Sequence, residues 1–489
     1  MSLNKFKAPL FEALVAHKRL QGNAFHVPGH KQQAAWHNEE AIAHFDALLA
    51  LDVTELSDTD DLHHPQGPLA EAQKLAADCY QAEDTSFLVG GSTAGNLAMI
   101  LGTCNPGEIF IVQRNVHKSI IHGLMIAGAK AVLLPPHIDS ISGLATVPSE
   151  ALLEAAISRY PESKAVIVTS PNYYGMGHNL KTLIELVHNR GIPVLVDEAH
   201  GPHFGFHPSF PGPALQAGAD LVVQSTHKML SAMTMGAMLH MQGNLIRKAA
   251  VKQALRMVQS SSPSFPLMAS LDLARQQIHT AGAAAFQPAL EAVEYVINQL
   301  KETPFRALGY GQYANSELAY DPLKMVLFDE SAKLSGLELR NELLRHNCVA
   351  EMSDSRYVVM AFGIGSRQAD GIALINALEE IAKQINNQPK RLTSIPLTDN
   401  SPVPDSKIPE AVAFSREEHR TKSIKLENCS GFTSAEWIIP YPPGIPILYP
   451  GEIITLEIIE QLQYWRRAGV QIQGAQDSEL ASIQVQMKK

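Results

Sequence analysis

Short apolar runs alternate with stretches of helical periodicity between Gln73 and about Gly243. Apolar runs of this length, bounded by turn residues, are typical of strands buried on both faces. Helical stretches such as 151–160 and 181–190 lie between most of them. The alternation predicts an α/β fold whose mostly parallel, seven-stranded sheet is covered on both faces. The predicted strands are 86–89, 109–112, 131–134, 165–168, 193–196, 221–223 and 236–240.

The pattern differs on either side of this region. Before it, 25–31 (F-H-V-P-G-H-K) and 51–68 contain Pro and Gly and predict loops, packed beside an active site or a subunit interface. After Met257 the helical periods lengthen, and a smaller α/β region follows with predicted strands at 322–328 and 357–362. The stretch 388–409 holds five prolines and predicts a linker or surface loop. The stretch 438–452 is too rich in proline for a helix or a central strand.

These changes predict four parts. They are an N-terminal segment (1–75) that contributes to the active site or a dimer interface, a large cofactor-binding domain (76–280), a small α/β domain (281–390), and a linker with a C-terminal region (391–489). A chain of 489 residues exceeds the size at which a single core stops growing, so more than one domain is expected.

Composition and charge exclude several classes of protein. The net charge of −10 argues against nucleic acid as the main partner. No apolar run approaches the length needed to span a membrane, and the N-terminus has no secretory apolar region. The four cysteines are scattered. His26 and His30 are four residues apart, but Pro28 and Gly29 between them predict a loop, so no pair of helical metal ligands is expected among His26, His30, His63 and His64. A reduced, cytoplasmic enzyme without a metal centre is expected.

Two neighbouring predicted strands end in residues that carry chemistry. The first is followed by Asp197 and His200, and the second by Ser225, His227 and Lys228. Ligands of open α/β sheets bind beyond the carboxyl ends of the strands, so a carboxylate and an amine are expected at the same edge. A protonated pyridine nitrogen would pair with Asp197, although a structural salt bridge to an arginine is the alternative. The Lys228 amine can form a Schiff base with an aldehyde cofactor, which makes pyridoxal phosphate the candidate.

Two further segments follow predicted strands. In Gly90-Gly91-Ser92-Thr93-Ala94-Gly95-Asn96, a helix is expected from Leu97, with Ser or Thr capping its phosphate-binding start. The alternative is an ordinary βα turn. In the segment 114–119 (R-N-V-H-K-S), a neutral His117 could lie flat on a cofactor ring, or simply be a solvated loop histidine.

Together, F-H-V-P-G-H-K, G-S-T-A-G-N, R-N-V-H-K-S, V-D-E-A-H-G, Q-S-T-H-K and Y-P-P-G-I-P…P-G-E resemble the motifs of the Orn/Lys/Arg decarboxylase class-I family. The resemblance runs from about residue 25 to 452, and implies a fold-type I pyridoxal-phosphate enzyme without an N-terminal response-regulator-like domain. One departure is Gly90-Gly91, where many members have Asn-Gly or Thr-Gly; this loses a side-chain contact at position 90.

The resemblance assigns roles to individual residues. Lys228 would be the Schiff-base lysine, Asp197 would pair with the pyridine nitrogen, and His200 would sit near the scissile carboxylate. His117 would stack on the ring and the small Ala199 would let the ring lie against the strand end. The remaining residues, Ser92, Thr93, Ser225 and His227, would hold the phosphate.

The resemblance also implies a reaction and an assembly. We expect decarboxylation of a basic amino acid in polyamine biosynthesis, with arginine to agmatine preferred over lysine to cadaverine or ornithine to putrescine. An aminotransferase or lyase of the same fold is the alternative, and a catalytically silent regulator is a third. Candidates for binding the distal cation of the substrate are Asp58, Asp60, Asp61, Glu436 and Glu452, while Arg367 could meet a substrate carboxylate or be a surface arginine. A homodimer or higher homo-oligomer, with active sites at the subunit interface, is expected.

Overall fold

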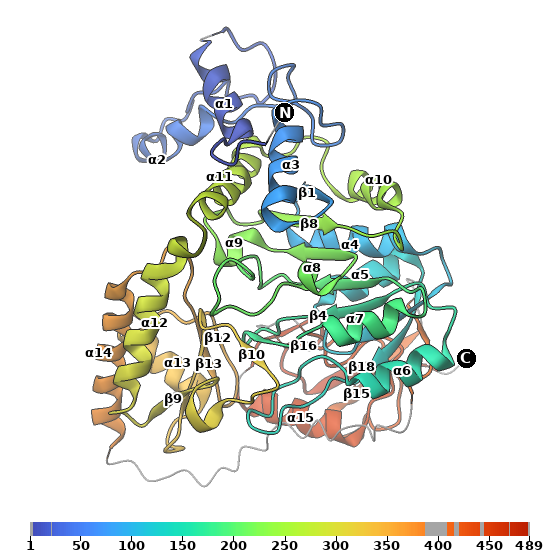
Figure 1. The fold of residues 1–489 in the computed structure, drawn as a ribbon. Coiled ribbons are helices and arrows are strands. Elements are labelled where there is room, and N and C mark those ends of the chain that lie inside the picture. The colour runs from blue at the N-terminus through green and yellow to red at the C-terminus, as the bar shows by residue number, and fades with distance from the viewer. Residues whose placement is uncertain are drawn as a thin grey trace. The chain divides into compact units, whose positions relative to one another are not determined.

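The computed structural model describes residues 3–20, 22–386, 408–414, 420–440, 445–468 and 470–487, and Figure 1 shows its ribbon. The chain separates into two compact units. The first unit comprises Met1–Thr103, Pro193–Gln287 and Gly363–Gly365, and the second comprises Cys104–Ile192, Pro288–Phe362 and Ser366–Lys489. Almost all of the predicted linker (388–409) and residues 441–444 of the Y-P-P-G motif lie outside the described residues.

The first unit contains four strands in the order β1 (Asp84–Leu88), β8 (Ala237–Met241), β7 (Leu221–Gln224) and β6 (Val194–Asp197). β6 and β7 are parallel, whereas β8 is antiparallel to both β7 and β1. Three of these four strands therefore run in the same direction. Every residue of β6, β7 and β8 is buried, as their unbroken apolar runs predict.

Helices cover the strands of the first unit. α4 (Gly91–Thr103) packs on β1, β7 and β8, and α10 (Lys248–Val258) packs on α4. α3 (Pro68–Tyr80), α11 (Phe265–Ala281) and α1 (Pro9–Arg19) pack on one another. The unit also contains α2 (Glu39–Leu49), α8 (Ala214–Ala217), α9 (Thr226–Met229) and the 3₁₀ turn η1 (Gly282–Phe286). The loops predicted at 25–31 and 51–68 are free of helix and strand, except that Pro68 is the first residue of α3.

The second unit contains β4 (Val166–Thr169), β2 (Ile109–Gln113), β3 (Lys130–Leu134) and β14 (Val412–Ala413), in this order. β2 is parallel to β3 and β4, and β14 adds an antiparallel edge pair to β3. α5 (Lys118–Ala127) connects β2 to β3 and α6 (Glu150–Arg159) connects β3 to β4, while α7 (Lys181–His188) follows later in the same unit. The short β5 (Met176–Gly177) pairs with β10 (Ala319–Tyr320).

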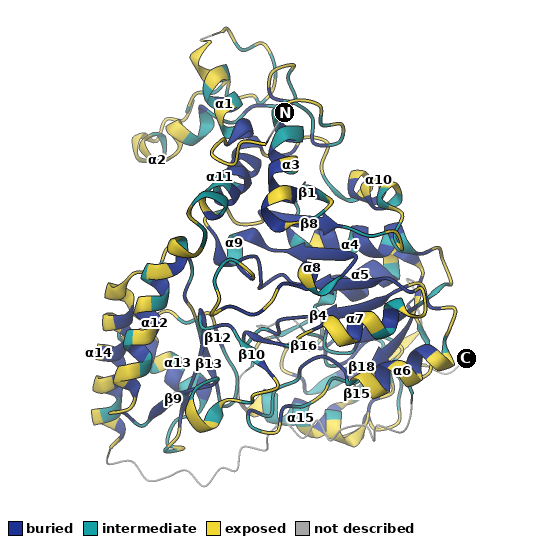
Figure 2. Cartoon of the chain, viewed as in Figure 1, coloured by how far each residue is buried: buried dark blue, intermediate teal, exposed yellow. Residues whose placement is uncertain are grey.

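A second sheet of this unit is antiparallel throughout. Its order is β12 (Met352–Ser353), β13 (Val358–Ala361), β11 (Lys324–Asp329) and β9 (Phe305–Ala307). Its helices are α12 (Gln287–Leu300), α13 (Gly336–Arg345) and α14 (Gln368–Ile385), and η2 (Gly311–Tyr313) precedes β10. Figure 2 shows α12 and α14 with exposed outer faces, while the strands are buried. The strands predicted at 322–328 and 357–362 are present here as β11 and β13. The division of the chain into four parts, with a small α/β domain at 281–390, stays a prediction.

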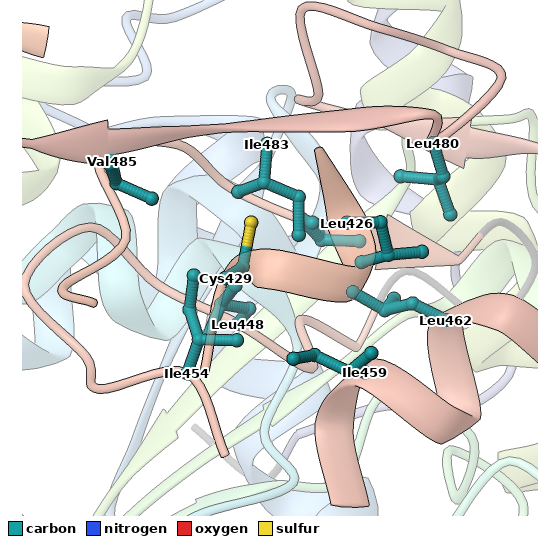
Figure 3. Packing of buried hydrophobic residues seen from close by; sticks show 10 residues of the cluster. Leu426, Cys429, Leu448, Ile454, Ile459, Leu462, Leu480, Ile483 and Val485 are labelled. Carbon is teal, nitrogen blue, oxygen red and sulfur yellow. The ribbon is translucent and has the colours of Figure 1, made fainter. Parts of the chain in front are cut away.

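The C-terminal part builds a small core of its own. It contains β15 (Thr421–Lys425) paired with β18 (Ser482–Gln486), β16 (Ile439–Pro440) paired with β17 (Ile472–Gln473), η3 (Leu426–Asn428) and α15 (Leu456–Ala468). Figure 3 shows Leu426, Ile459, Leu462 and Ile483 converging from η3, α15 and β18. Cys429 lies in this apolar cluster and is fully buried.

The α/β class and the mostly parallel sheet are confirmed. Each of the seven predicted strands is present; six agree within one residue at either end, and β1 starts two residues before the predicted 86–89. β14 is an additional strand that the sequence did not predict, because its two residues form a recognisable strand only by pairing with β3. Among the described residues, no helix is both long and apolar enough to cross a membrane.

Candidate active site

The carboxyl ends of β6 and β7 bring the predicted site residues of the first unit together. Asp197, the last residue of β6, lies opposite Val223 in the parallel register. Beyond the strands the pairing continues, since the Ser225 N–H donates to the Ala199 carbonyl at 3.2 Å. The segments 198–200 and 225–228 therefore start at the same edge of the sheet, as the rule for parallel strands requires.

Asp197 is a buried carboxylate, 3% exposed. Its Oδ2 accepts a hydrogen bond from Asn96 Nδ2 at 2.9 Å, and its Oδ1 accepts from the Ala199 N–H at 3.2 Å. Both donors are neutral. A buried charge is stable only with hydrogen bonds and a partner of opposite sign, so this environment favours a cation at the strand end.

Asn96 reaches Asp197 because α4 lies unusually close to the strands. A Cβ on Gly95 would stand 2.5 Å from Val223 Cγ2 and 2.8 Å from Leu88 Cδ1, so glycine is required at this position. The close approach buries Asn96, which is 1% exposed.

Lys228 lies in the single turn of α9 and is half-buried. Its Nζ is 2.9 Å from Nε2 of His200, which is 4% exposed. A charged amine donates to this nitrogen and requires the imidazole proton to be on Nδ1, whereas a neutral amine can accept from Nε2–H. One proton can therefore pass between the two nitrogens.

The residues before Lys228 present hydroxyl groups. Ser225 and Thr226 are each at most 1% exposed, and Ser225 Oγ and Thr226 Oγ1 have no hydrogen-bond partner among the described residues. Buried hydroxyls normally have partners, so both are available to a ligand. His227 Nδ1 bonds the Gly236 carbonyl at 2.9 Å. Burial lowers the His227 pKa, and in the neutral ring only Nε2 remains free, as an acceptor.

The helix expected from Leu97 begins earlier, at Gly91. Ser92 and Thr93 therefore lie in the first turn of α4 and do not cap it, which corrects the sequence-based expectation. The shift arises because Gly91, at φ = 69°, turns the chain directly from β1 into the helix. Both hydroxyl residues and the free N–H groups of a helix start are thus placed together.

His117 belongs to the second unit and is the N-cap of α5. Its Nδ1 lies 2.9 Å from Ser119 Oγ and accepts from the Ser119 N–H at 3.3 Å. These bonds fix the plane of the imidazole ring. Its role as a ring cover remains a prediction.

The residues that flank His117 are held by the C-terminal part of the same unit. Arg114 donates to both carboxylate oxygens of Glu452, at 2.9 and 3.0 Å, and lies 4.0 Å from the ring centre of Tyr449. Lys118 Nζ donates to Gln473 Oε1 at 2.9 Å. Residues far apart in the sequence therefore lock the segment that carries His117.

The acidic residues suggested for substrate binding all have partners within the chain. Asp60 accepts from four backbone N–H groups around the start of α3 and from the N–H of Asp61, and Asp61 accepts from that of His63. Asp58 bonds His17, Glu452 pairs with Arg114, and Glu436 accepts from the backbone of Gln476 and Gln484. Each thus has a structural role, and substrate binding by any of them stays a prediction.

Glu55 differs from these acids. Its Oε2 accepts from Thr54 Oγ1 at 2.6 Å, while its Oε1 is buried and has no partner among the described residues. Arg367 is exposed, and its backbone N–H is bonded by Asp370 at the start of α14. Contact of Arg367 with a substrate also stays a prediction.

Comparison with known proteins decides the family. Residues 8–307 match the model of the Orn/Lys/Arg decarboxylase major domain, and residues 400–476 match that of its C-terminal domain. The chain belongs to the Orn/Lys/Arg decarboxylase family.

The relatives match along nearly their whole length. A Bacillus subtilis (strain 168) protein named "Uncharacterized protein YaaO" is 39% identical over 95% of this chain and 96% of its own. "Arginine decarboxylase" of the same organism is 34% identical over 99% of this chain and 98% of its own. Among solved structures, lysine decarboxylase A from Pseudomonas aeruginosa has a TM-score of 0.83 at 20% identity, covering 98% of this chain and 80% of that one. That likeness confirms the fold.

The residues of this decarboxylase fit pyridoxal phosphate, the cofactor of the fold. Asp197 is buried and, among the described residues, accepts from neutral donors only, so it suits the protonated ring nitrogen. The orphaned hydroxyls of Ser225 and Thr226 suit phosphate oxygens. Lys228, at the end of the neighbouring strand, supplies an amine.

Two candidate site residues, Asn96 and Thr226, were not identified from the sequence, and neither was Glu198, a buried neighbour of the site. Asn96 and Thr226 stand inside quoted motifs, but only the packing of α4 and the burial of the hydroxyl reveal their roles. Glu198 follows Asp197 and is equally buried. An acid next to the key carboxylate in a buried strand end was the signal that could have singled it out.

Proposed function

We propose that this decarboxylase converts L-arginine to agmatine and CO₂ with pyridoxal phosphate. The observation that carries the chemistry is the buried Asp197, bonded only by neutral donors, at the strand end next to the one that leads to Lys228. The choice of arginine rests on the full-length relatives that bear the name arginine decarboxylase.

Pyridoxal phosphate, when bound, supplies a conjugated ring that accepts the electron pair left as the bond from Cα to the carboxylate breaks. In this proposal Asp197 keeps the ring nitrogen protonated, and Asn96 holds Asp197 in place. Ser92, Thr93, Ser225 and Thr226 hold the phosphate, and the proposed role of His117 is to cover the ring.

His227 and Ala199 complete the proposed cofactor set. Because its Nδ1 is bonded to the Gly236 carbonyl, His227 donates to a phosphate oxygen only when doubly protonated, a form that the phosphate charge would favour. Ala199 is small and 9% exposed, which leaves room beside the strand end.

The proton transfers are assigned to Lys228 and His200. Their nitrogens are 2.9 Å apart, so a proton held at Lys228 Nζ can be replaced from His200 Nε2. In this proposal one of them returns a proton to Cα after CO₂ leaves. Exclusion of water from the site would favour loss of the carboxylate charge.

A homodimer is part of the proposal. The N-terminal part of the first unit exposes large apolar side chains, with Phe25 at 93%, Val27 at 65%, Phe45 at 47% and Trp36 at 45%. α2 has no buried residue at all. A second copy of the chain would cover such a surface and complete the active sites. A cytoplasmic location and a role in polyamine biosynthesis are proposed with it.

The test is a panel of substrates: arginine, lysine, ornithine and neutral amino acids, with CO₂ and the amine product both measured. Arginine is expected to be fastest. Faster release of CO₂ from lysine or ornithine would show that this amino acid, and not arginine, is the preferred substrate. Formation of a keto acid without CO₂ would favour an aminotransferase. No product from any of them would refute the proposal. Lys228→Ala is the control, and continued amine formation by it would refute the role of Lys228.

A further inference from the structure

A buried side-chain hydrogen bond joins the two strand ends that carry the site. Glu198, 2% exposed, directly follows Asp197, and Gln224 directly precedes Ser225. Gln224 Nε2 and Glu198 Oε2 are 2.6 Å apart, and Glu198 Oε1 accepts from the Ala214 N–H at 2.7 Å. This bond therefore fixes the spacing between the β6 and β7 ends.

The same bond begins a chain that crosses all four strands of the first unit. Gln224 Oε1 lies 3.1 Å from His240 Nε2 on β8, and His240 Nδ1 lies 2.8 Å from Thr85 Oγ1 on β1. Every member is buried, at 3% exposure or less. Such a fully satisfied buried network holds its members rigidly.

The chain Glu198–Gln224–His240–Thr85 has two consistent directions. With Glu198 ionised, Gln224 Nε2 donates to it, His240 Nε2–H donates to Gln224, and Thr85 donates to His240 Nδ1. With Glu198 protonated, its hydroxyl donates to Gln224 Oε1, the turned amide donates to His240 Nε2, and His240 Nδ1–H donates to Thr85. The amide and imidazole orientations follow from the hydrogen bonds in either case.

We propose that Glu198 is a positioning residue, which holds Asp197 and Lys228 in register through Gln224 and reverses the direction of this chain when it gains or loses a proton. The inference rests on the proposed function only where activity is measured. Glu198 itself touches neither substrate nor cofactor in this account.

The surroundings of Glu198 support a protonated state near neutral pH. Burial raises the pKa of Glu198 to about 8, although the hydrogen bonds from Gln224 and the Ala214 N–H act to lower it. Burial also lowers the His240 pKa to about 3 and raises that of Tyr80, which faces Glu198 from α3, well above 10. Gly201 and the Ala214 N–H of α8, both uncharged, also lie beside Glu198. His240 and Tyr80 thus stay neutral while Glu198 titrates.

The protonation of Glu198 makes the stability of the fold depend on pH, and the sign of this dependence is definite. Since the folded-state pKa lies above the ordinary value of 4.5, the folded protein holds more protons than the unfolded one between about pH 4.5 and 8. The contribution of Glu198 to stability is complete below this window and falls as the pH rises through it. Glu198→Gln, whose amide copies the protonated carboxyl, has no such dependence.

The experiment compares wild type with Glu198→Gln and Glu198→Ala. Asp354→Asn is the matched control, because burial also raises the pKa of Asp354 but its partner, Tyr174, lies outside the site. The cofactor dissociation constant is measured, together with kcat and KM as functions of pH. The infrared band of protonated carboxyl groups is recorded in the apoprotein at about pH 6 and about pH 10.

We expect Glu198→Gln to keep cofactor affinity and neutral-pH kcat within about twofold, and Glu198→Ala to lose about 100-fold in kcat, the cost typical of a 1 Å misplacement. Wild type should lose part of the infrared band of protonated carboxyl groups at high pH. This pH-dependent part of the band should be absent from Glu198→Gln and present in Asp354→Asn. Equal kcat in the Gln and Ala variants would overturn the positioning role, and an unchanged band in Glu198→Gln would overturn the protonation. If wild type released no CO₂, the proposed function would fail, while the infrared and cofactor-affinity results would still judge this inference.

Discussion

Gly95→Ala tests how the approach of α4 to the strands supports the site. The new Cβ would stand 2.5 Å from Val223 Cγ2, and ordinary contact begins at 3.4 Å. The helix or the strand must therefore move by about 0.9 Å at this point, since Leu88 Cδ1 at 2.8 Å closes the other side. Asn96 is the next residue of α4, so it moves with the helix.

The energetic consequence follows from that displacement. Overpacking a core costs about 1–3 kcal/mol, partly offset by about 1 kcal/mol from the better helix propensity of alanine. The bond from Asn96 Nδ2 to Asp197, now 2.9 Å, would stretch beyond 3.5 Å. Losing a hydrogen bond to a charged group costs about 1.5–3 kcal/mol, so cofactor affinity should fall about 10- to 100-fold.

The assay is cofactor titration followed by thermal unfolding of the apoprotein. Gly102→Ala is the matched control: it lies on the same helix, and its Cβ would meet the Val251 backbone of α10 at 2.6 Å. It should lose stability but keep cofactor affinity. Gly95→Ala combined with Val223→Ala should recover affinity, because the nearest clashing atom is removed. Wild-type affinity in Gly95→Ala alone would refute the reasoning.

Three further predictions concern the rest of the chain. Arg114→Met should lower the free energy of unfolding by about 2–4 kcal/mol, because Glu452 is left partly buried without its partner. Arg345→Met, which removes an exposed arginine from its pair with Glu342, should lower it by less than about 0.5 kcal/mol. Equal losses in denaturant titrations of the two variants would contradict this. Glu55→Gln should raise KM for arginine about tenfold with little change in kcat if its orphaned oxygen receives the substrate cation, and an unchanged KM would exclude that role. Burial acts to raise the pKa of Asp60, but the backbone N–H donors outweigh burial, so the pKa is lowered overall. Ionised Asp60 therefore stabilises the folded protein above about pH 4, and this contribution is lost as the pH falls through the folded-state pKa. Asp60→Asn should lower stability by about 1 kcal/mol at pH 7 and by less in acid, as pH-dependent unfolding would show.

The strands of the large sheet were predictable because each is a buried apolar run with little ambiguity of period. β6 illustrates this: P-V-L-V predicts a strand, and the structure places it at Val194–Asp197. The start of α4 was placed too late because glycines and hydroxyl residues normally precede a helix. Here Gly91 supplies the left-handed turn, and Ser92 and Thr93 enter the first turn itself.

The placement of the candidate site residues was predictable where they follow a strand, as Asp197 and Lys228 do; their roles stay predictions. It was not predictable where a role depends on tertiary contact. Asn96 acquires its role only because Gly95 lets α4 approach the strands. Arg114 likewise looked like part of a cofactor motif, and the structure shows that its side chain holds Glu452 and Tyr449 of the C-terminal part.

The same distinction explains why the cofactor is easier to infer than the substrate. A ring nitrogen and a phosphate require a carboxylate and hydroxyls at fixed strand ends, and Asp197 and Ser225 stand there. A distal guanidinium requires only an acid at the right distance, and loops supply many acids that serve the fold instead. Asp60, for example, accepts hydrogen bonds from four N–H groups around the start of α3. The unsatisfied oxygen of Glu55 is therefore a better guide to substrate recognition than the number of acids nearby, because a buried orphan carries an energetic cost that a ligand would remove.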